Sequence, residues 1–176
     1  MMDLINETCR NSAIGSLIDE LERACEIVNR LDDDAYALGW SGESSIGAHI
    51  RHNLEFVNEL LNGIAERRVD YNARRRDIRV EIDRAYAIEQ ISFAGSRLRS
   101  LTVGILASLV MVRSEIDEDV WHTSSVSREI EFLHSHTVHH YALVARRMAD
   151  LGMQTDPTLG VAPSTLRFRA AVAASF

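Results

Sequence analysis

Residues 130–144 read Ile130-Glu131-Phe132-Leu133-His134-Ser135-His136-Thr137-Val138-His139-His140-Tyr141-Ala142-Leu143-Val144. In this stretch, residues that could face a core recur at a helical spacing. Its positions Ile130, Leu133, Thr137, Tyr141 and Val144 recur every three or four residues, which is the period of an amphipathic α-helix. A serine cap near residue 125 and a glycine stop at residue 152 set the expected ends of this helix. The stretch therefore predicts a long helix with one face turned toward a core.

Three earlier stretches show the same period. They run from Ile5 to Leu31, from Ile46 to Ile64 after a cap at Ser44 or Ser45, and from about Asp83 to Leu101. Cys9 and Cys25 both fall on the first apolar stripe, so we expect buried, unreactive thiols. We predict an all-α fold in which four helices pack into one bundle, as a single domain over residues 1–176.

The segments between the helices are of two kinds. Residues 66–81 are charged, too long for a simple helix hairpin and poor in glycine and serine, so we expect this connection to pack on the surface. Before the last helix the period shortens toward two at Val110 and Val112, and Asp117-Glu118-Asp119 is typical of a turn. With a return over Val120-Trp121-His122, this pattern predicts a small β-hairpin.

The composition restricts the class of protein. The chain has 176 residues, of which 46% are hydrophobic and 26% charged, with a formal net charge of -7. That negative charge argues against nucleic acid as a partner. The longest apolar run, residues 103–112, is too short to span a bilayer, and two distant cysteines do not form a disulfide scaffold. We expect a soluble, cytoplasmic protein without a membrane segment.

Two histidines of the last helix are spaced for one metal ion. His136 and His140 are four residues apart, so their Cβ atoms should lie about 5–6 Å from each other on one helix face. At about 100° per residue, His140 lies about 50° and His136 about 90° from the centre of the apolar stripe, whereas His139 lies about 150° away. The pair could bind a divalent cation, and a catalytic zinc site would need a third protein ligand from another helix.

The second helix offers two candidates for the third ligand. His49 and His52 both lie in Ser44-Ser45-Ile46-Gly47-Ala48-His49-Ile50-Arg51-His52-Asn53-Leu54-Glu55-Phe56. His49 is nearer to the apolar stripe, so periodicity alone prefers His49. Each histidine taken singly could equally be an ordinary hydrogen-bonded residue, but several on the inner sides of two helices would each need a partner when buried.

These stretches resemble the DinB-like family, also described as YfiT-type metal-dependent hydrolases. The resemblance covers the chain from the first helix to about Leu151, and residues 45–52 and 136–144 match the family's patterns on its second and fourth helices. Residues 70–76 and 162–166 are similar to one bacterial subgroup. The resemblance implies an up-down-down-up four-helix bundle, a homodimer, and a histidine triad that binds zinc or nickel.

Transferred residue by residue, the resemblance implies metal ligands at His52, His136 and His140, with His49 as the alternative ligand or as a supporting partner of the site. The chain departs from many relatives at Thr137, where a glutamate often follows the first histidine. No His-Glu-x-x-His general base is present, so the base for an activated water would be the metal-bound hydroxide itself or another residue, for which Glu55 is a candidate.

Two classes of function follow from the resemblance. Relatives include enzymes, both hydrolases and transferases that use low-molecular-weight thiols, so a small thiol or another small molecule is the expected substrate. The alternative is a non-catalytic metal-binding or stress-associated bundle protein, and a purely structural bundle is the third reading. We expect Arg74, Arg75 and Arg76 to be solvated rather than to bind an anionic substrate, and Tyr71 either to cover the site or to pack the connection.

Overall fold

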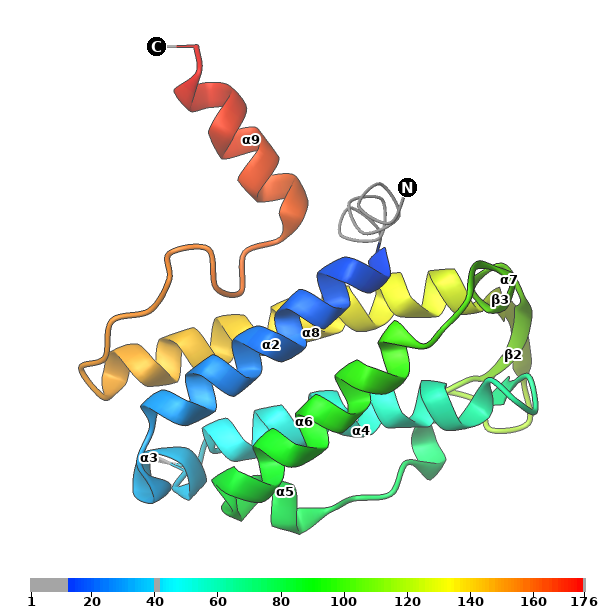
Figure 1. Ribbon diagram of the computed structural model, residues 1–176, viewed down its shortest axis with the longest axis horizontal. Coiled ribbons are helices and arrows are strands. Elements are labelled where there is room, and N and C mark those ends of the chain that lie inside the picture. Colours follow the sequence, from blue (N-terminus) through cyan, green and yellow to red (C-terminus); the bar gives the residue numbers. More distant parts are fainter. Residues whose placement is uncertain (1–12, 40–41, 176) are drawn as a thin grey trace.

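A computed structural model describes residues 13–39 and 42–175 of the chain. Four long helices form a bundle, as Figure 1 shows, and they are α2 (Ala13–Arg30), α4 (Ile46–Gly63), α6 (Arg84–Arg99) and α8 (Val126–Asp150). Shorter elements occupy the connections and the C-terminal part, namely α3 (Asp33–Ala37), β1 (Arg68–Val69), η1 (Tyr71–Ala73), α5 (Ile78–Ile82), α7 (Val103–Leu106), β2 (Leu109–Arg113), β3 (Trp121–Ser125) and α9 (Pro163–Ala173).

The bundle has the up-down-down-up topology. Helices α2 and α8 run in one direction, and α4 and α6 run in the opposite direction (Figure 1). Helix α2 packs against α6 and α8, and α4 packs against the same two helices from the other side. The long connection between α4 and α6 allows these two helices to be parallel neighbours. The predicted all-α fold class and its topology are confirmed.

The predicted helix starts coincide with side-chain caps. The hydroxyl Oγ of Ser45, rather than that of Ser44, accepts a hydrogen bond from the Ala48 amide at 3.0 Å, and Asp83 and Ser125 cap α6 and α8 in the same way. Helix α6 ends at Arg99, two residues before the predicted end. The start of the first helix at Ile5, and Cys9 on it, lie outside the described residues, while Cys25 is half-buried and burial raises the pKa of its thiol.

The core lies between the four long helices. Every stripe that the periodicity predicts contributes fully buried side chains, because an apolar face of each helix must leave water. The largest of them include Leu17, Val28, Ile46, Val57, Leu60, Ile91, Leu98, Ile130, Leu133, Tyr141 and Met148. Among residues 13–39 and 42–175, no helix is both long enough and apolar enough to cross a membrane.

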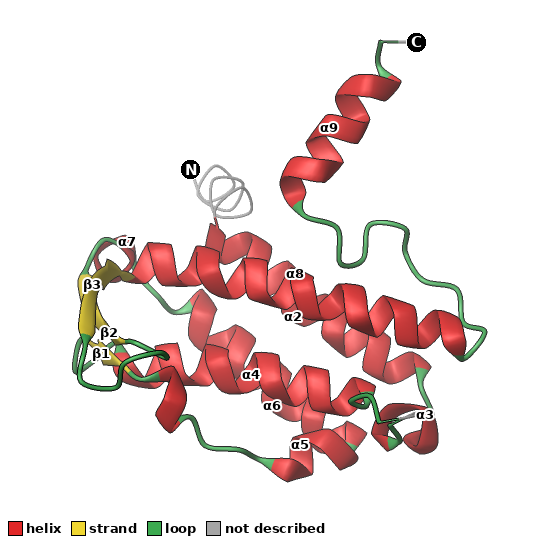
Figure 2. Ribbon diagram, turned by 180° about the vertical axis from the view of Figure 1, so that it is seen from behind, coloured by secondary structure: helices red, strands yellow, loops and turns green. Residues whose placement is uncertain are grey.

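The predicted β-hairpin is present at one end of the bundle. Strands β2 and β3 pair antiparallel, with Met111 opposite Thr123. Strand β1, from the connection after α4, adds a parallel pairing in which Arg68 is opposite Met111, so the sheet has the order β1-β2-β3 (Figure 2). This third strand was not predicted, because two residues show no detectable period.

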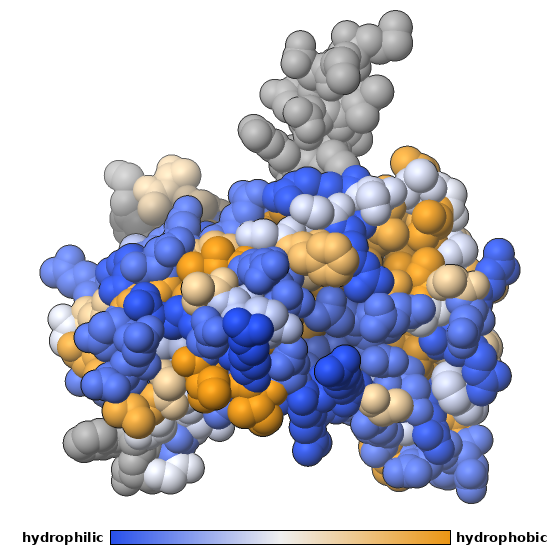
Figure 3. All heavy atoms as spheres, turned by 60° about the horizontal axis from the view of Figure 1, so that its bottom comes forward, coloured by the Kyte–Doolittle hydropathy of each residue, from blue (hydrophilic) through white to orange (hydrophobic). Residues whose placement is uncertain are grey.

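The connection over residues 66–81 is not confined to the surface, so that prediction is wrong in part. Val69, Tyr71 and Val80 are buried in the core. The backbone of the connection also lies directly on α4, since a Cβ added to Gly47 would be 2.1 Å from the Glu81 carbonyl oxygen. Figure 3 shows that the face that carries α5 is mostly hydrophilic. Because most residues of the connection are charged, its composition alone did not reveal the three buried side chains.

The C-terminal part follows α8 back along its outer side and then leaves it. Leu159 is buried, and Gly160 has φ +73° and packs so closely on α8 that an added Cβ would be 2.2 Å from the Ala142 amide nitrogen. Helix α9 then projects from the bundle (Figure 1), and none of its residues is buried.

Candidate metal centre

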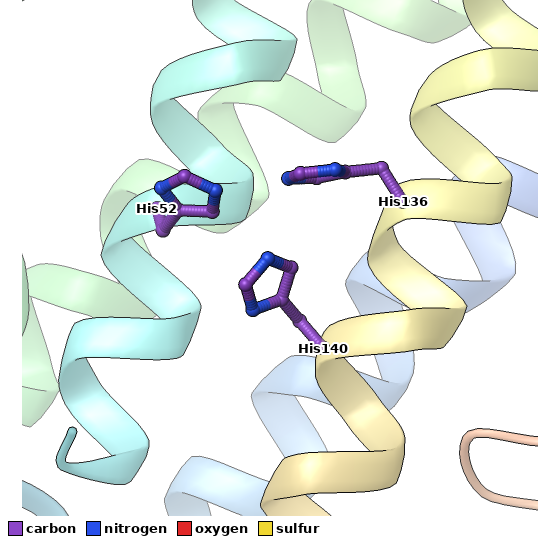
Figure 4. Close-up of side chains that lie close together, drawn as sticks. All are labelled: His52, His136 and His140. Atoms are coloured by element: carbon purple, nitrogen blue, oxygen red, sulfur yellow. The ribbon is translucent and has the colours of Figure 1, made fainter. Parts of the chain in front are cut away.

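Three histidines converge between two helices of the bundle. Helix α4 supplies His52 and helix α8 supplies His136 and His140, whose rings are directed toward a common space in Figure 4. One ring nitrogen from each residue lies within 4.8 Å of the others. Imidazole nitrogens bind zinc at about 2.0–2.1 Å, so small side-chain rotations would bring all three to a single ion. These are the residues that the family resemblance implied as ligands, and we call them the His triad.

The helical spacing explains the two histidines on α8. The ring centroids of His136 and His140 are 4.7 Å apart, as expected for neighbours one turn apart on the same face. His139 is exposed, as its angle from the apolar stripe predicted, although its ring lies 5.4 Å from that of His140, and Thr137 is buried. His134 is half-buried and does not belong to the His triad.

Aromatic rings form one wall of the centre. The Phe56 ring stacks on His136 at a centroid distance of 4.6 Å and contacts the His52 ring at 4.8 Å. Phe132 lies 5.7 Å from His136 on the same side. The three triad residues are only half-buried, so the centre has an apolar wall and an opening to solvent.

The surroundings keep the imidazoles neutral at physiological pH. Burial, followed by the charges of neighbouring histidines, lowers the pKa of His140 to about 3 and that of His52 to about 4. Burial also lowers the pKa of His136. A neutral imidazole has a free lone pair, which is the state that a metal ion requires.

One nitrogen of the His triad lacks a protein partner. Within the described part of the chain, Nε2 of His136 is buried and makes no hydrogen bond. Buried polar atoms normally have a partner, because an unpaired one costs about 1–3 kcal/mol. A metal ion would satisfy this nitrogen, so the residues present fit a bound cation.

His49 supports the His triad without joining it. Its Nδ1 lies 2.9 Å from Nδ1 of His140, so one ring donates a hydrogen bond to the other. This contact fixes the orientation of His140 and leaves Nε2 of that ring available to an ion. The apolar periodicity of this helix favoured His49 over His52 as the third ligand. However, α4 is buried around much of its circumference. Such a wide buried face does not define how the helix is rotated about its axis.

Glu55, the candidate base, is bound to other protein groups. Its Oε1 accepts hydrogen bonds from Nη1 of Arg51 at 2.6 Å and from the Asp77 amide at 3.2 Å. Arg51 also donates to Glu81 at 2.8 Å. Glu55 therefore ties α4 to the connection and α5, and its role as a general base gains no support.

Tyr71 packs beside the centre and orders a carboxylate that sequence reasoning missed. The Tyr71 ring stacks on Phe56 at 5.1 Å, and its hydroxyl donates a hydrogen bond to Oε2 of Glu129 at 3.0 Å. Burial raises the pKa of Tyr71, which therefore stays protonated. Ser124 donates to the other oxygen of Glu129 at 2.6 Å. Glu129 precedes His136 by about two helical turns, so both residues lie on the same side of α8. This spacing could have indicated from the sequence that Glu129 lies near the centre.

A pocket of about 430 Å³ opens at this end of the site, between the β-sheet and α8. Tyr71, Glu129 and Phe132 line the pocket, together with His122 and Arg128. Tyr71 stacks on Phe56 and so extends the aromatic wall, to which Phe132 also belongs. The pocket therefore adjoins the His triad.

The prediction that Arg74, Arg75 and Arg76 are all solvated is wrong for Arg74. Arg75 and Arg76 are exposed as predicted, but the side chain of Arg74 is only 15% exposed. Its positive charge contributes to lowering the pKa of both His52 and His136. Tertiary packing therefore buries one arginine of the three beside the metal centre, and the neighbouring residues in the sequence do not indicate which one.

The low pKa values of the His triad predict a loss of stability in mild acid for the metal-free protein. In the unfolded chain His52 and His140 should bind protons below about pH 6.5, whereas in the fold their pKa values are about 4 and about 3. The unfolded state therefore gains protons first, and the free energy of unfolding should fall as the pH drops through this interval.

Denaturant titrations in the presence of a chelator would measure this pH dependence. A variant with His52→Gln and His140→Gln should show a flatter dependence than the original protein. Equal slopes for the two proteins would contradict the pKa assignments.

Comparison with known proteins agrees with this geometry at the level of the fold. No protein-family model matches the chain. A 103-residue segment is 30% identical to FK506-binding protein 5 of Rhizopus delemar, but it covers 56% of this chain and 27% of that protein, so the chain spans about a quarter of its relative.

A solved structure extends the comparison over most of the bundle. The crystal structure of a DinB-like protein from Bacillus subtilis superposes with a TM-score of 0.62, covering 82% of this chain and 94% of that one at 13% identity. The chain therefore has the fold of a DinB-like protein, as its sequence resemblance implied.

Proposed function

We propose that the protein binds one divalent metal ion, zinc or nickel, through His52, His136 and His140. The observation that carries this proposal is the convergence of three neutral imidazoles, with one nitrogen of each within 4.8 Å of the others. The buried and unpartnered Nε2 of His136 supports it independently.

We further propose that the site is catalytic, as a metal-dependent hydrolase or a transferase of a low-molecular-weight thiol. Structural zinc sites are closed by four protein ligands, whereas catalytic sites use three and leave a position for water or substrate. Among the described residues, the triad group contains no fourth histidine, cysteine or carboxylate. A bound cation would lower the pKa of a water or thiol in that open position.

The surrounding residues favour the thiol reaction. Glu55 on α4 and Glu129 on α8 both accept hydrogen bonds from protein donors. Neither is arranged to take a proton from a nucleophile. A thiol, with an ordinary pKa near about 8.5, depends less on such a base than water does.

A ligand-exchange measurement tests the open position. With cobalt in place of the native ion, addition of a small thiol or azide should change the visible spectrum, because exchange at an open position alters the ligand field. His134→Ala is the control, because this histidine of α8 lies outside the His triad, and it should respond like the original protein. An unchanged spectrum at saturating ligand, with a fourth protein donor identified, would instead favour the non-catalytic metal-binding function.

A further inference from the structure

The guanidinium group of Arg74 lies one aromatic ring away from two residues of the His triad. Its Cζ atom is 4.6 Å from the centroid of the Phe56 ring. The same ring lies 4.6 Å from His136 and 4.8 Å from His52. Phe56 thus contacts the cation and both imidazoles, and the charge of Arg74 reaches these rings, since it contributes to lowering the pKa of His52 and of His136.

Most hydrogen-bonding capacity of Arg74 is unused. Its Nη1 donates to the Tyr71 carbonyl oxygen at 2.6 Å, which holds the side chain against the aromatic wall. Its Nε is buried without a hydrogen bond and lies 3.8 Å from Oε2 of Glu55, too far for one. A guanidinium has five N–H donors, and a hydrogen bond from one of them, on Nη1, holds the side chain beside the aromatic wall.

The charges around the centre leave room for an anion. Glu55 is the carboxylate beside Arg74, but it also pairs with Arg51 at 2.6 Å, and Arg51 pairs with Glu81 at 2.8 Å. Arg51 and Arg74 are thus opposed by Glu55 and Glu81, and Glu59 also interacts with the charge of Arg74. Three neutral imidazoles leave the full charge of a divalent ion uncompensated, so a ligand that completes the site is expected to be negative.

We propose that Arg74 is a substrate-binding residue and that the site takes a small organic acid, whose carboxylate lies between the guanidinium group and the open position at the His triad. Arginine suits this role because its planar donors match a carboxylate. The aromatic wall of Phe56, Phe132 and Tyr71 would pack against the apolar part of such a substrate. This inference rests on the proposed metal site.

Acetate is the probe, and the matched variants are Arg74→Gln and Arg76→Gln. Both remove one positive charge from the same segment, but Arg76 is exposed. Acetate is titrated into the cobalt-loaded proteins and followed by the visible spectrum. We expect about one cobalt ion per chain in each protein, and an acetate affinity that falls by about ten- to a hundredfold in Arg74→Gln and stays unchanged in Arg76→Gln.

Each other outcome has a definite meaning. Equal acetate affinity in the two variants, with cobalt bound, would overturn the role of Arg74 and leave the metal site standing. A native chain that binds no cobalt would overturn the proposed metal site and this inference together. If circular dichroism shows that Arg74→Gln does not fold, Arg74→Lys decides the question, because it keeps the charge and loses the planar donors. Its acetate affinity should be several-fold weaker, and an unchanged affinity would overturn the proposal.

Discussion

Replacing either His136 or His140 with alanine is expected to abolish stoichiometric metal binding while leaving the helical content nearly unchanged. A metal ion needs its full set of ligands, so the loss of one of three imidazoles should weaken binding by orders of magnitude. The fold should persist, because both residues are only half-buried and the core side chains of α8, such as Leu133 and Tyr141, remain in place.

Metal analysis after dialysis, together with circular dichroism, would measure both effects. His134→Ala is the matched control, because this half-buried histidine of the same helix is not part of the His triad. If the variant lacking both His136 and His140 still retained one ion per chain, the ligand assignment would be wrong.

The second large effect is expected at α4, where His52→Ala should abolish binding and His49→Ala should only weaken it. His52 belongs to the His triad, whereas His49 acts on it through the 2.9 Å contact with Nδ1 of His140. Loss of a partner that orients a ligand typically costs about ten- to a hundredfold in metal affinity.

Competition with a chelator of known affinity would rank the two variants. The ranking His52→Ala below His49→Ala supports the triad as the structure arranges it. The reverse ranking would show that the apolar stripe of α4 was the better guide and that His49 is the ligand.

The helices themselves could be predicted because their causes are local. The apolar spacing of Leu133, Tyr141 and Val144 and the capping residues Ser45 and Ser125 act within a turn or two of their own positions. The hairpin followed for the same reason, since alternation and a turn lie within a few residues of each other.

The site was predictable only where it depends on a single helix. His136 and His140 are neighbours because four residues make about one helical turn, whatever the rest of the chain does. The choice between His49 and His52 depends on how α4 is rotated against α8. The family resemblance implied His52, whereas the apolar stripe of α4 favoured His49. Because α4 is buried on much of its surface, its apolar stripe does not define this rotation.

Four amphipathic helices, their caps, the hairpin and a pair of imidazoles one turn apart could all be predicted from patterns of neighbouring residues. The convergence of His52 with these imidazoles, the burial of Arg74 but not of Arg75, and the hydrogen bonds from Tyr71 and Ser124 to Glu129 required the folded structure. The two groups of features differ in the range of the interactions that cause them. Periodicity and capping act between near neighbours, whereas the burial of a charged or titratable side chain depends on partners that the fold brings from far along the chain.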